Sequence, residues 1–293
     1  MSSIIVTDPD LLKSHVKGHY RNGQWVSGYD NKVVKKPGVT APQYGMPGSH
    51  ASHFNSKFGF GPSGGQGSLF SGSMALVPKG PPPKPKGFHP KLDDAGKKVG
   101  LYHPHIPNLS GLYNPKAIAT FTPGQKMPAE LNGIPFAPWA DAPTTDDGWE
   151  NVAGQKELDE PPMHLPPGIK DAASGLIIAE PDGRVWVVSP SNRFGGYKNT
   201  FPKGKVEGEM SFQANALKEA YEEAGLKCRI VDFVGDVKRT TSVCRYYLAV
   251  REGGSPAECG WESQAVHLVP GGRLRNFLDA AVDRNVVAKL AAL

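Results

Sequence analysis

Apolar positions follow regular patterns mainly in the second half of the chain, from about Ser174 onward. Residues 174–180 and residues 184–189 are both rich in branched and aromatic side chains, which is typical of strands. Between them, Pro-Asp-Gly at positions 181–183 supplies turn-forming residues. We therefore predict that this stretch forms a β-hairpin.

A helix is predicted next, over about residues 211–224. Ser211 is suited to cap its start, and Gly225 is suited to end it, because glycine adopts the left-handed conformation without strain. Further regular elements follow this helix. They are strands at 229–237, 242–250 and 265–269, and helices at 274–281 and 284–293.

The first 167 residues differ from this pattern, since they hold 23 of the 28 prolines. We expect a short hairpin at 19–29 around an Asn-Gly turn, and Gly/Ser-rich and Pro/Lys-rich linker at 59–67 and 78–90. An ordered lead-in at 132–139 should precede a capped turn or short helix at 146–150. Proline pairs at 161–162 and 166–167 mark the boundary. The prediction is a largely irregular N-terminal region, 1–167, that acts as a tether or a partner-binding arm, and a folded domain over 168–293.

Charge is distributed unevenly in this N-terminal region. Residues 1–126 carry 15 Lys and Arg against 5 Asp and Glu, whereas residues 127–167 carry 1 against 8. The basic part is suited to a nucleic-acid or protein partner, to folding back on the acidic part, or to remaining solvated. The sequence leaves these alternatives open, and it leaves the oligomeric state unknown.

Cysteine content and hydropathy bear on location. Cys228, Cys244 and Cys259 are odd in number and lack metal-type spacing, so we expect reduced core thiols. His103 and His105 lack the partners that would complete a metal site, so we expect structural or surface roles for them. No apolar run of membrane-spanning length and no secretory signal is found. We expect a cytoplasmic protein without a membrane partner.

Three carboxylates carry the clearest chemical signal in the chain. Glu219, Glu222 and Glu223 stand at i, i+3 and i+4 of the predicted helix, so their ionised forms repel one another unless a cation lies between them. Mg²⁺ and Mn²⁺ prefer such oxygen ligands and bind through a few carboxylates plus substrate phosphates. A solvated Glu-rich helix is the alternative interpretation.

The segment beginning at Gly204 resembles the Nudix box. That pattern runs Gly, five residues, Glu, seven residues, Arg-Glu, an aliphatic residue, any residue, Glu-Glu, any residue, Gly and an aliphatic residue. Five positions of this chain stay in register with it: Glu219, Glu222, Glu223, Gly225 and Leu226. Two depart, because Met210 stands at the family's first Glu, with Glu209 one residue early, and Lys218 stands at its Arg. In the family this Glu and Arg look like a structural pair that lies outside the metal cage.

The resemblance covers about residues 170–293 and implies an α+β fold in which a mixed sheet lies between helices, a Nudix-like α/β/α sandwich. It also implies a site for Mg²⁺ or Mn²⁺ formed by the Gly204 carbonyl with Glu219, Glu222 and Glu223. In that site Glu222 is either a third ligand or the residue that orients water. Some family members take their base from a downstream loop, where Glu258 and Glu262 are candidates, although the sequence favours a surface glutamate at each of these positions.

Basic residues near this site are candidates for binding phosphate. Lys203 and Lys205 flank the glycine turn as point charges, and Arg239 and Arg245 lie on a polar stretch at a predicted strand edge, where they would clamp a distal phosphate. For each residue, a solvated surface position is the alternative.

The resemblance implies metal-dependent attack of water on a diphosphate. The substrate would be a nucleotide-like molecule such as a dinucleoside polyphosphate, capped RNA, ADP-ribose or a nucleotide sugar. The alternative is a non-catalytic binding or structural protein that keeps a degenerate Nudix fold as a scaffold. Met210 favours this alternative, and the three intact glutamates oppose it.

Overall fold

A computed structural model describes residues 18–21, 24–27 and 84–290. The predicted N-terminal hairpin is present: β1 (Gly18–Arg21) pairs antiparallel with β2 (Gln24–Ser27). The expected linker at 59–67 and residues 78–83 of the linker expected at 78–90 lie outside the described residues, whereas residues 87–90 of that linker form part of a strand. No helix in the described ranges is long and apolar enough to cross a membrane.

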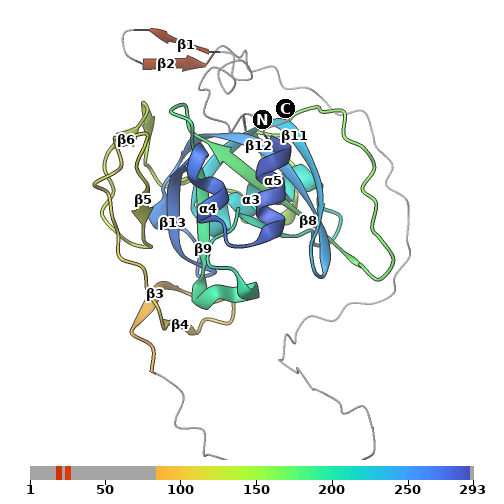
Figure 1. The fold of residues 1–293 in the computed structure, drawn as a ribbon, viewed down its shortest axis with the longest axis horizontal. Coiled ribbons are helices and arrows are strands. Elements are labelled where there is room, and N and C mark those ends of the chain that lie inside the picture. The colour runs from red at the N-terminus through yellow and green to blue at the C-terminus, as the bar shows by residue number, and fades with distance from the viewer. Residues whose placement is uncertain (1–17, 22–23, 28–83, 291–293) are drawn as a thin grey trace, which may run out of the picture. The chain divides into compact units, whose positions relative to one another are not determined.

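A mixed seven-stranded sheet forms the centre of the part from residue 84 onward (Figure 1). Its strand order is β11-β12-β8-β9-β13-β5, with β10 paired to β8 beside this path. The strands are β5 (Ala119–Phe121), β8 (Asp171–Ala179), β9 (Arg184–Pro190), β10 (Lys203–Lys205), β11 (Leu226–Lys238), β12 (Ser242–Gly254) and β13 (Ser263–Pro270). Only β8 and β12 run parallel to each other; the other pairs are antiparallel.

Alternation along the central strands gives the sheet two apolar faces. Ile178 and Tyr247 point to one core and their neighbours Ile177 and Tyr246 to the other, as the two-residue period of a strand requires. Helix α3 (Phe212–Ala224) packs in the first core; α4 (Leu274–Phe277) and α5 (Ala281–Leu290) pack in the second. The result is a layered α/β/α sandwich, which confirms the predicted fold class.

Helix α3 begins and ends where the sequence predicts. The Ser211 side chain accepts a hydrogen bond from the Ala214 amide, and Gly225 ends the helix with φ 69°. The predicted helix 274–281 is wrong in extent, because the chain turns extended at Leu278 (ψ 124°) and starts a new helix at Ala281. The Leu278 side chain is buried in the second core, so tertiary packing ends the helix early.

One edge of strand β8 pairs with β12 along its whole length, and the other edge divides its pairing between two partners. Its residues Ile178 and Ala179 pair with β9, as expected for the hairpin, whereas its residues 173–175 pair with β10. Because of this division, the Lys203–Lys205 turn lies directly beside the start of β8. The glycine turn is thereby fixed next to helix α3, which contacts both β8 and β10.

Part of the stretch before residue 167 belongs to the same body as the sheet. It contains short elements: β3 (Gly87–Leu92), β4 (Lys98–Leu101), β6 (Glu130–Leu131), β7 (Ile134–Pro135) and α2 (Asp146–Glu150). Strand β5 adds an edge to the sheet, and Leu112, Phe136 and Trp149 are buried in the core that α3 shares. The division at residue 167 stays a proposal, and these contacts extend the packed body back at least to Leu112.

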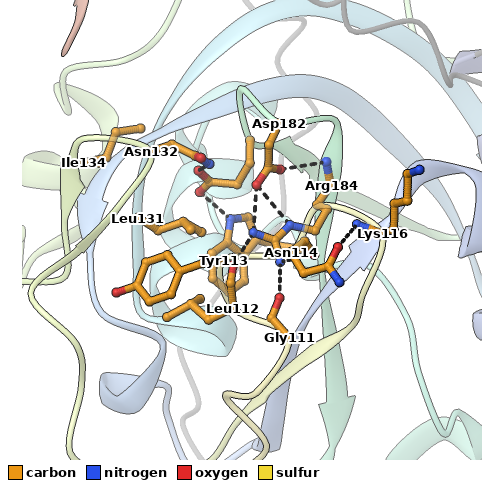
Figure 2. Close-up of polar contacts among 12 residues, drawn as sticks. Gly111, Leu112, Tyr113, Asn114, Lys116, Leu131, Asn132, Ile134, Asp182 and Arg184 are labelled. Carbon is orange, nitrogen blue, oxygen red and sulfur yellow. Dashed lines mark hydrogen bonds and ion pairs between the residues drawn. The ribbon is translucent and has the colours of Figure 1, made fainter. Parts of the chain in front are cut away.

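Two buried arginines of the sheet bind the segment that precedes residue 167. Arg184 forms an ion pair with Asp182 at 2.7 Å and donates to the carbonyls of Gly111 and Leu112 (Figure 2). Arg251 forms an ion pair at 2.5 Å with Glu180, and both side chains are fully buried.

Two further groups, Asn132 Nδ2 and Trp186 Nε1, donate to the carboxylate of Glu180, each at 2.9 Å. Buried ion pairs of this kind are tolerated where hydrogen bonds satisfy their remaining polar atoms. The Arg251 contact therefore belongs to a satisfied network.

The three cysteines are buried and unpaired, as predicted. Burial raises the pKa of the Cys244 thiol to about 12 and that of the Cys259 thiol to about 12, so both remain protonated near neutral pH. They behave as small apolar core residues.

Candidate functional site

The three glutamates of α3 differ in exposure. Glu223 is buried, with 8% of its surface accessible. Glu219 is half-buried, whereas Glu222 is exposed and lies 3.8 Å from Lys218, one helical turn earlier. The helix therefore directs two of the three carboxylates toward the protein and leaves the third at its edge.

Glu223 is held by the turn that precedes the helix. Its Oε2 accepts a 2.8 Å hydrogen bond from the Lys203 amide. Burial raises the pKa of this carboxyl to about 7; the Lys203 charge and amide oppose the rise, and Glu262 and Glu222 add to it. The carboxylate thus has one fixed donor and lacks full charge compensation.

Glu219 lies against Gly204. A Cβ placed on Gly204 would meet Glu219 Oε1 at 2.0 Å, so only glycine fits between the turn and this carboxylate. Burial raises the pKa of Glu219 well above its usual value, and the charges of Glu223, Glu222 and Glu262 raise it further. The sequence-predicted pairing of the glycine turn with the acidic helix is thus present in space.

Asn215, which was not among the residues predicted from the sequence, joins helix α3 to the Gly204 turn. Its Nδ2 donates to Ser174 Oγ at 2.9 Å and to the Gly204 carbonyl at 3.3 Å. It stands four residues before Glu219, and Glu219 stands four before Glu223, so all three share one helical stripe. This four-residue spacing is the sequence feature that could have indicated Asn215 as a site residue.

Glu262 joins this group from the loop before β13. Its charge raises the pKa of Glu219 and Glu223, which places it within electrostatic reach of both. Burial raises the pKa of Glu262 itself, and Asp94 adds to the rise. Glu258, the other candidate base, instead forms an ion pair with Lys91 at 3.8 Å.

The two lysines of the turn have different surroundings. The Lys203 ammonium lies 5.1 Å from the centroid of the Tyr197 ring, a cation–π contact, and its charge acts on Glu223 and Glu262. Lys205 forms a 2.7 Å ion pair with Asp171 on the neighbouring strand, and about half of its side chain is exposed. Lys203 is therefore the lysine that lies beside the acidic group.

Arg239 and Arg245 are buried, in contrast to the exposed strand-edge position expected for them. Arg239 forms a 2.7 Å ion pair with Asp283 of α5 and donates to the Tyr246 hydroxyl. Arg245 forms a 2.8 Å ion pair with Asp236.

Arg245 also donates to the Pro161 carbonyl at 2.7 Å and lies 3.2 Å from the carboxylate of Glu160. These contacts hold α5 and residues 160–161 against β11 and β12. The Arg239 guanidinium lies 4.9 Å from the centroid of the Tyr197 ring, which Lys203 also contacts, and the Arg245 guanidinium lies 4.9 Å from that of Phe212 on α3.

Met210 and Lys218, the two residues that depart from the Nudix box, both have partners in the structure. Met210 is partly buried against the core that α3 shares. Lys218 pairs with Glu222 on the same helix. No buried charge is stranded at these two positions, which agrees with the expected structural role of the pair in the family.

The described ranges contain no group of three or more His, Cys, Asp or Glu side chains that is arranged to hold a metal ion. The donor chemistry still suits a hard divalent cation, because the half-buried Glu219 and the buried Glu223 lie within one acidic group and lack full charge compensation. His105 lies elsewhere, 5.3 Å from the ring of His267. A structural or surface role for His105 stays a prediction.

Comparison with known protein families finds a match in the C-terminal part of the chain. A family model described as the NUDIX domain matches residues 169–290. Comparison with curated proteins gives no match.

Similar solved structures include a Nudix hydrolase from Nitrosomonas europaea, with 19% identity over 42% of this chain and 71% of that one and a TM-score of 0.37. An ADP-ribose pyrophosphatase from Streptococcus suis shows 18% identity over 41% and 87%, with a TM-score of 0.34. An Ap4A hydrolase from C. elegans shows 18% identity over 42% and 96%, with a TM-score of 0.35. At these values the likenesses carry no conclusion about activity or substrate.

Proposed function

Since residues 169–290 of this chain match the model of the NUDIX domain, we propose that the protein hydrolyses a diphosphate linkage in a nucleoside diphosphate derivative, with Mg²⁺ or Mn²⁺ as cofactor. The observation that carries the proposal is the pair of inward carboxylates, Glu219 against Gly204 and Glu223 against the Lys203 amide. Both have raised pKa values, as expected for buried acids without a counter-ion.

Glu219, Glu223 and the Gly204 carbonyl would hold the cation, with Glu222 at the rim as a third carboxylate. A bound divalent cation supplies charge neutralisation for the phosphates and lowers the pKa of water. The Gly204 carbonyl already accepts from Asn215, which fixes its orientation. Lys203 provides an ammonium group near the same position for a phosphate oxygen.

In the reaction, a water oxygen forms a bond to phosphorus while the bond from phosphorus to the bridging oxygen breaks. The bridging oxygen leaves with the second phosphate product. The proton of the attacking water passes to a carboxylate, for which Glu262 and Glu222 are the candidates. Glu262 is preferred because it comes from outside the helix and reaches the acidic group from a separate loop.

The substrate class stays open among dinucleoside polyphosphates, capped RNA, ADP-ribose and nucleotide sugars. Each of Arg239 and Arg245 is paired with an internal carboxylate, and their binding of a distal phosphate stays a prediction. The buried, unpaired cysteines support a reducing compartment such as the cytoplasm.

A tether or partner-binding role is proposed for the residues before the packed body. Of the basic part, residues 1–126, those from 84 onward lie within the described structure, and several of them pack on the sheet. The proposal therefore concerns residues 1–83, whose partner would be a protein or a nucleic acid.

The proposal is tested by magnesium-dependent phosphate release from a substrate panel that covers these four classes. We expect turnover of at least one member by the full chain and its loss in Glu219→Gln. Glu157→Gln, an exposed glutamate outside the site, is the matched control and should keep full activity.

A scaffold function is the second candidate, and Met210 in place of a glutamate is the observation that favours it. It predicts no release from any member of the panel and no binding of Mn²⁺. Turnover that depends on Glu219 would exclude it.

A further inference from the structure

The β3–β4 hairpin precedes the family-matched residues, yet it contacts the loop that carries Glu262. The indole Nε1 of Trp261 donates a 3.0 Å hydrogen bond to Asp94 Oδ1 at the hairpin turn. Lys91, on β3, donates to the Glu258 carbonyl and lies 3.8 Å from the carboxylate of Glu258. The hairpin thus holds this loop at two points, on either side of Cys259.

A second segment ties the other end of the hairpin to the same place. Asn192 Nδ2 donates to the Gly100 carbonyl at 2.8 Å, and Asn192 Oδ1 accepts from the Tyr102 amide at 3.1 Å. Figure 1 shows β3 and β4 beside the short helical turn that follows β9. Asn192 has φ 55°, a left-handed conformation that an asparagine adopts more readily than most residues.

Ser191, which precedes Asn192, forms hydrogen bonds to the loop that carries Glu262. The Ser191 amide donates to the Glu262 carbonyl at 2.6 Å, and the Ser191 hydroxyl donates to the Trp261 carbonyl at 2.7 Å. Ser191 therefore forms two hydrogen bonds to the backbone at Trp261 and Glu262. The side chain of Trp261 forms a further hydrogen bond to Asp94.

Asp94 also lies within electrostatic reach of Glu262. Its charge raises the pKa of that carboxyl, after the larger effect of burial. Asp94 is exposed, so its bond to the half-buried Trp261 contributes little to the apolar core.

We propose that Asp94 is a positioning residue, which fixes Trp261 and thereby holds Glu262 against the acidic helix. The inference rests on the proposed function, because it assigns Glu262 to the reaction. It also assigns a role to a segment outside the Nudix domain, which makes residues 87–101 part of the working site.

The experiment compares Asp94→Ala, Asp94→Asn and Trp261→Phe in the full chain, with Asp141→Ala as a matched exposed control. Asp94→Ala should lower kcat about 10-fold or more, with KM changed less, because a small misplacement of a reacting group can cost on the order of 100-fold. Asp94→Asn keeps an oxygen that accepts from the indole, so it should retain most of the activity. The double variant Asp94→Ala with Trp261→Phe should be no worse than either single variant, since both break one bond.

Hydrogen exchange of residues 256–263 provides a readout that does not depend on turnover. Exchange there should be faster in Asp94→Ala than in the wild type or in Asp141→Ala. Unchanged kcat and unchanged exchange in Asp94→Ala would overturn the proposal, and so would equal losses in Asp94→Asn and Asp94→Ala. A wild-type chain that is inactive on every substrate would count against the proposed function, and the exchange result would still decide whether Asp94 holds the loop.

Discussion

The backbone amide of Lys203 donates a 2.8 Å hydrogen bond to Oε2 of Glu223, twenty residues further along the chain. This bond joins the turn that precedes α3 to the last turn of the helix. Because the acceptor is also a proposed cation ligand, the same carboxylate serves the fold and the reaction.

Two substitutions at Glu223 separate these roles. Glutamine keeps an oxygen that accepts from the Lys203 amide, whereas alanine leaves that amide without an acceptor, at a cost of about 1–3 kcal/mol. Both variants should lose turnover, and only Glu223→Ala should lose stability. Urea unfolding at fixed pH measures the difference, and equal stability of the two variants would show that the bond contributes nothing to the fold.

A side chain at Gly204 should displace Glu219. The Cβ of Gly204→Ala would fall 2.0 Å from Glu219 Oε1, so we expect activity to fall on the order of 100-fold, as misplacement of a reacting group does. The control is Gly253→Ala, whose Cβ would meet nothing closer than Lys227 Cβ at 3.9 Å. Steady-state kinetics of the two variants test the prediction, and full activity of Gly204→Ala would contradict it.

Stability of the metal-free protein should fall as pH rises. The pKa of Glu223 in the folded state is raised to about 7, so the folded state holds this proton more tightly than the unfolded chain does. The stabilisation is complete below the ordinary value of 4.5 and is lost as the pH rises through about 7. Glu219, whose pKa is also raised, acts in the same direction.

Thermal unfolding between about pH 5 and about pH 8 measures this effect. Without divalent cation the midpoint should fall over this interval, and the fall should be smaller in Glu223→Gln. Saturating Mg²⁺ should counter the fall, because the ionised carboxylates then have a counter-ion. A midpoint that rises with pH in the metal-free wild type would refute the assignment.

Removing Arg251 should destabilise the protein strongly. The variant Arg251→Met leaves Glu180 as a buried charge without its partner, which costs about 3–5 kcal/mol. A double variant with Glu180→Gln should lose less, since neither charge remains. Arg229→Met provides the surface control, because its ion pair with the half-exposed Glu252 is worth about 1 kcal/mol or less. Urea unfolding of the three variants decides, and a loss no larger in Arg251→Met than in Arg229→Met would contradict the account.

Features that depend on local sequence could be predicted. Ser211 and Gly225 bound helix α3 as expected, because cap and stop signals act over a few residues. The alternation that places Ile177 and Ile178 in opposite cores is also a local property. The same holds for the acidic stripe on α3.

Features that depend on distant partners could not be predicted. Nothing near Arg184 in the sequence indicates that its guanidinium binds carbonyls 72 and 73 residues earlier. The polar stretch around Arg245 looks like an exposed strand edge, and only its tertiary partner Asp236 and the carbonyl of Pro161 show that it is buried. Asp94 is the same case, since its role becomes visible only when the hairpin meets Trp261.

The central claim is that α3 holds a divalent cation through Glu219 and Glu223. Titration of Mn²⁺ into the full chain, with the free ion followed by electron paramagnetic resonance, tests it most directly because no substrate has to be known. We predict saturable binding by the wild type and by Glu157→Gln, and its loss in Glu223→Gln. Equal binding by Glu223→Gln and the wild type, or no binding by the wild type, would contradict the account.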